Sequence, residues 1–175
     1  MLVRAAVALV FGAVTVFWAA PPVTGMGWAG GLYLLATGVV IIWTVTKTGF
    51  RPREGAGRIL SAGGAVLAGA GAAVALIPSP LVFGTIAAVG LGVAGAAELA
   101  AGVLGRGRSV LGRDWIASGV IGLGTAAALP FFIGLGAHAL LGVAGGGAII
   151  SGVLWMLSGL TLRHDARGES AEAVN

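Results

Sequence analysis

The sequence contains no cysteine and only six acidic residues among its 175. The absence of cysteine excludes disulfides, thiolate nucleophiles and cysteine-ligated metal sites. Charged residues make up 9% of the chain, whereas a soluble domain carries about 25%. Because 58% of the residues are hydrophobic and the mean hydropathy is +1.03, we expect an all-α integral membrane protein with the lipid bilayer as its main partner.

Recognisable catalytic and ligand-binding motifs are also lacking. Residues 90–95 match the GxGxxG pattern, but a dinucleotide site needs a preceding strand and an acid about 20 residues further on, and neither is present. The ten basic residues form no dense patch with interleaved aromatics, so nucleic acid is excluded as a partner. We therefore expect no enzyme, no cofactor and no metal site.

Long apolar runs alternate with short polar connections. The runs comprise residues 5–20, 28–45, 59–77 and 81–104, and a stretch over 115–162 of 48 residues without Asp, Glu, Lys or Arg. Since a span needs about 20 residues, the last stretch accommodates two. The sequence thus predicts six transmembrane helices, with turns marked by Pro21, Pro78 and Pro130.

A repeat of 57 residues relates Gly38, Gly95 and Gly152, and Pro21 and Pro78 share the same offset. We predict three tandem helical hairpins with proline-containing outer turns, over about 1–50, 55–108 and 113–163. They form a single membrane domain within 1–175, followed by a short polar tail over 164–175.

All Lys and Arg residues lie at the N-terminus, in the connections after the second and fourth runs, or in the tail. The positive-inside rule then places both termini and both basic connections in the cytoplasm of a multi-pass cell-membrane protein. Trp18 and Trp28 are expected at the outer interface, and Trp43, Trp115 and Trp155 toward the inner one.

Glycine contributes 33 residues and indicates close helix packing. We expect such contacts at Gly38, Gly95, Gly102 and Gly152, and at Gly142 and Gly146, which have GxxxG spacing. A second copy of the chain or another membrane protein is the further partner that such surfaces suit.

Glu98 is the one acid inside a long apolar run. On a helix its neighbours at three and four residues are Ala94, Gly95, Ala101 and Gly102, so it should face the protein. Three interpretations remain open: a neutral carboxyl bonded to a neighbouring helix, a titrating group that handles protons or ions, or a side chain that reaches the inner interface near Arg106 and Arg108.

His138 follows Pro130 by eight residues and should lie near the outer boundary of the membrane. Its imidazole is either a simple interfacial group or a proton sensor.

The pattern of helix, proline turn and small-residue helix, with the segment 95–101 around Glu98, resembles the HdeD-like membrane proteins. Gly38, Gly95, Gly152, Pro21 and Pro78 also carry the likeness, which spans nearly the whole chain. The resemblance implies a six-span bacterial inner-membrane protein without enzymatic activity, involved in acid or envelope stress tolerance. The alternative is a small transporter or channel that uses Glu98 as a protonatable or ion-binding group.

The segregation of Lys and Arg yields a topology that reporter fusions can test. A fusion after Asn175 should report a cytoplasmic C-terminus, and one in the Pro78 turn should report the outside. An external C-terminus would overturn this topology.

Overall fold

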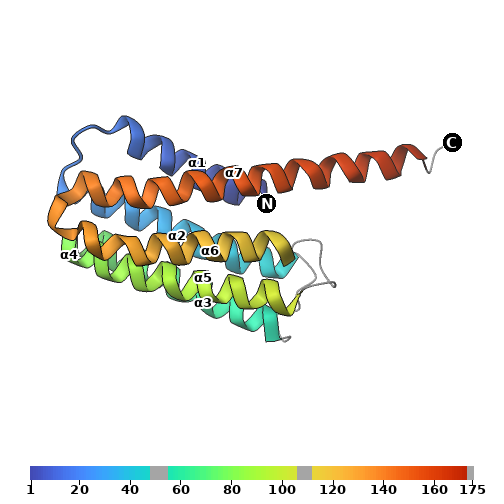
Figure 1. Ribbon diagram of the computed structural model, residues 1–175, viewed down its shortest axis with the longest axis horizontal. Coiled ribbons are helices and arrows are strands. Elements are labelled where there is room, and N and C mark those ends of the chain that lie inside the picture. The colour runs from blue at the N-terminus through green and yellow to red at the C-terminus, as the bar shows by residue number, and fades with distance from the viewer. Residues whose placement is uncertain (48–54, 106–111, 173–175) are drawn as a thin grey trace.

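The computed structural model describes residues 1–47, 55–105 and 112–172, and side chains up to residue 164. In this part of the chain all secondary structure is helical (Figure 1). The elements are α1 (Leu2–Phe17), α2 (Val23–Lys47), α3 (Gly55–Leu76), α4 (Pro80–Val82), the π-helical turn η1 (Phe83–Ala87), α5 (Ala88–Leu104), α6 (Gly112–Ala128), the 3₁₀ segment η2 (Leu129–Leu135) and α7 (Gly136–Glu172).

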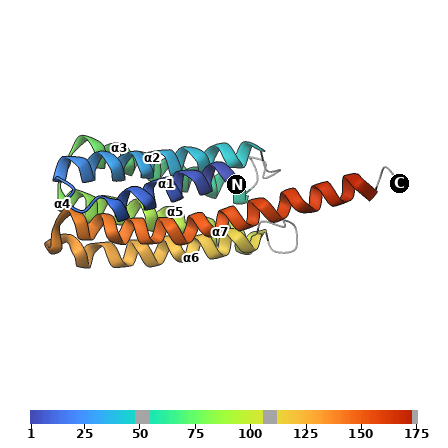
Figure 2. The same cartoon turned by 90° about the horizontal axis from the view of Figure 1, so that it is seen from above.

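The long helices run side by side and close into a ring. Around the ring α1 packs on α2, α2 on α3, α3 on α5, α5 on α6, α6 on α7, and α7 returns to α1 (Figures 1 and 2). Successive helices are antiparallel, so the connections near Pro21, Pro78 and Pro130 gather at one end of the bundle. The N-terminus and the C-terminal half of α7 lie toward the other end.

The described residues include four helical stretches that are long and apolar enough to cross a membrane: Val23–Lys47, Gly55–Leu76, Pro80–Leu104 and Gly112–His164. The last has 53 residues and folds back at η2, whereas Leu2–Phe17 is a shorter apolar helix. Large apolar side chains cover the outside, among them Val10, Leu32, Val89, Val120 and Leu157. Such a surface suits lipid, and the chain is a multi-pass helical membrane protein.

Proline and glycine determine where the helices begin and reverse. Pro21 lies between α1 and α2, and Pro78 lies between α3 and α4. Pro130 was expected to mark the third turn, and it lies in η2, where the chain folds back between α6 and α7. Gly136 follows η2, and its φ of 83° is the one positive value in the described residues. A side chain would strain that backbone, so this turn also depends on glycine.

Glycines from different hairpins make close contacts between the backbones of neighbouring helices. A Cβ at Gly38 would collide with the backbone of Gly64 and Ala68, and one at Gly95 would lie 2.9 Å from the carbonyl oxygen of Gly119. These contacts join α2 to α3 and α5 to α6. The predicted hairpins are therefore held together by the interfaces between them.

Two more of the expected glycines also lie at contacts. A Cβ at Gly102 would lie 2.7 Å from the carbonyl oxygen of Gly112, and one at Gly152 would lie 2.8 Å from Cγ of Leu9. Gly152 is thus the α7 counterpart of Gly38 and Gly95, and its contact joins α7 to α1.

Gly142 and Gly146 do not form the expected GxxxG contact. A Cβ at either position would have no atom of a described residue within 4 Å. The glycines that pack in this part of α7 are Gly145, against Thr15, and Gly147, against Thr125.

The predicted polar tail over 164–175 contains the end of α7, which continues as a helix to Glu172 and extends beyond the bundle (Figures 1 and 2). The basic residues Arg51, Arg53, Arg106 and Arg108, and the hairpin limits at 50 and 108, lie outside the described residues.

The α5–α6 contact predicts that Gly95→Ala destabilises the protein. The added methyl group would meet backbone atoms that cannot rotate away, which typically costs about 1–3 kcal/mol. Gly124→Ala on α6 is the matched control, since its Cβ meets nothing within 4 Å in the described residues. Thermal unfolding in detergent measures both, and equal melting temperatures would contradict the packing role of Gly95.

Candidate functional site

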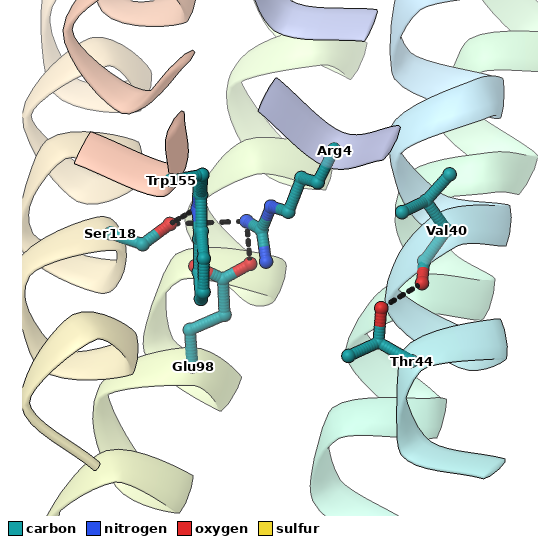
Figure 3. A network of polar contacts seen from close by, with 6 residues as sticks. All are labelled: Arg4, Val40, Thr44, Glu98, Ser118 and Trp155. Atoms are coloured by element: carbon teal, nitrogen blue, oxygen red, sulfur yellow. Dashed lines mark hydrogen bonds and ion pairs between the residues drawn. The ribbon is translucent and has the colours of Figure 1, made fainter. Parts of the chain in front are cut away.

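A buried ion pair between Arg4 and Glu98 lies inside the ring (Figure 3). Nη2 of Arg4, on the first turn of α1, donates a hydrogen bond to Oε1 of Glu98 on α5. The two side chains are only 9% and 4% exposed. The pair therefore joins residues that are 94 positions apart in the sequence, in an environment where unpaired charge is costly.

Ser118 connects this pair to the other half of the bundle. Its Oγ lies 3.0 Å from Nη2 of Arg4 and 3.2 Å from Nε1 of Trp155, and it accepts a hydrogen bond from each (Figure 3). Ser118 belongs to α6 and Trp155 to α7. The network thus joins four of the helices through one guanidinium group.

Two tryptophan rings enclose the guanidinium. Cζ of Arg4 lies 4.6 Å from the centroid of the Trp155 ring and 5.3 Å from that of Trp115. The two rings meet edge to face with centroids 5.1 Å apart, and both side chains are fully buried. This arrangement stabilises a cation through the ring faces and excludes water from it. Trp115 and Trp155, expected from the sequence toward the inner interface, therefore point into the bundle rather than outward from it.

Two polar atoms of the site are left without a partner. Within the described residues, Nη1 of Arg4 and Nε1 of Trp115 are buried and make no hydrogen bond. A buried donor that lacks an acceptor costs about 1–3 kcal/mol. The site therefore retains donor capacity beyond the ion pair.

A small cavity of about 40 Å³ adjoins the ion pair. Arg4 and Glu98 line it, and every long helix contributes to its wall. Its hydroxyl-bearing lining residues are Tyr33, Thr37, Ser118, Thr125 and Ser151. One water molecule needs about 10–15 Å³ of such space, so the cavity fits only very small occupants.

The 57-residue repeat explains why these side chains meet. Arg4, Ser61 and Ser118 occupy equivalent positions in the three hairpins, and Ile41, Glu98 and Trp155 form a second such set. Equivalent positions of helices arranged in a ring lie at the same depth. The second set is buried, at 1%, 3% and 0% exposure. The repeat therefore places one base, one acid and one indole around a common centre.

Of the two candidate intramembrane residues named from the sequence, only Glu98 belongs to this site. Its side chain is buried inside the ring and, among the described residues, its partner is Arg4. Arg106 and Arg108, the partners considered from the sequence, lie outside the described residues. His138 is exposed on the first turn of α7 and lies outside the network. The described residues contain no group of three His, Cys, Asp or Glu side chains that could hold a metal.

Sequence reasoning missed Arg4, Ser118 and the two tryptophans as site residues. From the sequence, Arg4 was used only as one of the basic residues that indicate a cytoplasmic N-terminus. The repeat offset that relates Glu98 to Trp155, and Arg4 to Ser118, was the available clue. Comparisons of the chain with family models, curated proteins and solved structures found no match.

A double-mutant cycle tests the ion pair. Arg4→Met and Glu98→Met should each cost about 3–5 kcal/mol, because each leaves the other charge buried without its partner. The double variant should recover most of this loss, since neither charge remains. Lys47→Met, which removes an exposed charge, is the control. Unfolding in detergent measures all four variants, and single losses that simply add would show that the two residues are not coupled.

Proposed function

We propose that the chain is a non-enzymatic inner-membrane protein that crosses the bilayer six times. Four helical stretches have sufficient length and hydropathy, and the longest folds back into α6 and α7. α1 supplies the sixth crossing in this proposal: it has 16 residues and packs beside α7 along the bundle. At roughly 24 Å it is shorter than the hydrocarbon core of about 30 Å, a mismatch that membranes accommodate by local thinning.

The charge distribution supports cytoplasmic termini. Lys47 ends α2, while Arg58 and Arg113 lie near the starts of α3 and α6. These positions are at the end of the bundle opposite the turns near Pro21, Pro78 and Pro130. His138, at the start of α7, lies near those turns. This separation suits the positive-inside rule.

We propose a role in acid or envelope stress tolerance, as the resemblance to the HdeD-like proteins implies. The observation that carries this proposal is the buried Arg4–Glu98 pair. Acid would protonate Glu98 and leave Arg4 as a buried cation without its counterion. A ring with such a centre responds to acid without any catalytic step.

The alternative function is that of a small transporter or channel in which Glu98 handles a proton or ion. The cavity beside the pair and the unpartnered Nη1 of Arg4 favour this alternative.

Acid challenge of a bacterial host that expresses the protein tests the main proposal. The wild type should raise survival, whereas Glu98→Gln, which cannot change its charge, should lose much of this effect at equal membrane abundance. Gly124→Ala is the control, because it alters no contact of the site. Unchanged survival with correctly inserted wild-type protein would contradict the proposed role.

Flux measurements in liposomes test the alternative. A proton or ion flux that requires Glu98 would replace the non-transporting role with a transport function. A wild type that remains impermeable to both supports the main proposal.

A further inference from the structure

The cavity at the centre of the ring is lined by Arg4, a charged side chain with one N–H donor that makes no hydrogen bond to a described residue. Arg4 lines the cavity, is 8% exposed, and its Nη1 has no partner within the described residues. Its Nη2 is already engaged by Glu98 and Ser118. A buried guanidinium with a free N–H beside a cavity is suited to an acceptor that carries negative charge.

The charged residues around the cavity determine which charge a bound ion can carry. Among its described lining residues, Arg4 and Glu98 are the charged ones and Tyr33 is the other titratable group. The amino group of Met1 also lies close enough to Arg4 to interact with it electrostatically. While Glu98 is ionised the pair is neutral and an additional anion would be repelled by the carboxylate. Once Glu98 is protonated, Arg4 alone determines the charge of the site.

The size of the cavity limits the size of the anion. About 40 Å³ is room for only a few water molecules, and a single halide ion fits this space. The hydroxyl-bearing residues Thr37 of α2 and Ser151 of α7 also line the cavity, so both neighbours of α1 contribute polar side chains to its wall.

We propose that this cavity is a site for one small monovalent anion, chloride or another halide, which binds to Arg4 together with a proton on Glu98. The charges balance, because the carboxylate gains a proton while the guanidinium exchanges its carboxylate partner for the anion. The site goes beyond the acid-tolerance role and does not depend on it. Because one proton binds together with the anion, acid favours binding of the anion.

Chloride-dependent thermal unfolding of the full-length protein in detergent tests the proposal. At constant ionic strength, chloride replaces gluconate, which is too large for the cavity. Across a series from about pH 4 to pH 8, which spans the usual range of carboxyl titration, chloride should raise the melting temperature of the wild type strongly in acid and little at neutral pH. An equal shift at every pH, or the same shift in gluconate, would overturn the proposal.

Variants separate the site from a general effect of salt. Glu98→Gln imitates the protonated carboxyl and should be stabilised by chloride at every pH, which is a gain of binding that a purely structural role would not produce. The double variant Arg4→Gln, Glu98→Gln should lose the chloride effect throughout. Gly124→Ala should behave as the wild type. A Glu98→Gln protein that folds but ignores chloride would refute the coupling.

A second measurement applies even where the variants fold poorly. Crystals of the wild type grown in acid with bromide should show anomalous scattering within hydrogen-bond distance of Arg4. No bromide in that cavity would refute the site.

Discussion

The ion pair between Arg4 and Glu98 is the interaction on which the rest of the structure depends. It lies where water is excluded, so each charge requires the other, and the helices that carry them must stay together. Ser118 and Trp155 extend the same requirement to α6 and α7. Because α1 is the shortest of the long helices and contributes Arg4, the pair also determines how the N-terminal end of the chain completes the ring.

Small residues make this arrangement possible. Lipid provides no hydrophobic force between helices, so the ring relies on close backbone contact and on buried polar groups. Gly38 and Gly95 bring their helices against glycines of the neighbouring hairpin, whereas Gly152 meets the larger side chain of Leu9. Two of these three equivalent contacts thus share one geometry, while at the centre of the ring the repeat has diverged into a base, an acid and aromatic rings.

Much of the fold follows from the sequence, because hydropathy reports directly on which segments lipid can surround. The apolar runs predicted the long helices, and Glu98 was expected to face the protein, as it does. The partner of Glu98 could not be found this way, since Arg4 precedes the first apolar run and there resembles a cytoplasmic anchor. The contact of Trp155 with Arg4 could not be predicted either, because an indole near the end of an apolar run is equally typical of the membrane interface.

The central claim is that Glu98 is ionised and paired with Arg4 inside the ring at neutral pH. Carboxyl infrared spectroscopy of the wild type and Glu98→Gln near neutral pH tests this claim most directly. The account predicts that the difference between the two proteins contains a carboxylate band and no protonated-carboxyl band. A protonated-carboxyl band that disappears in Glu98→Gln would show a neutral acid and contradict the ion pair.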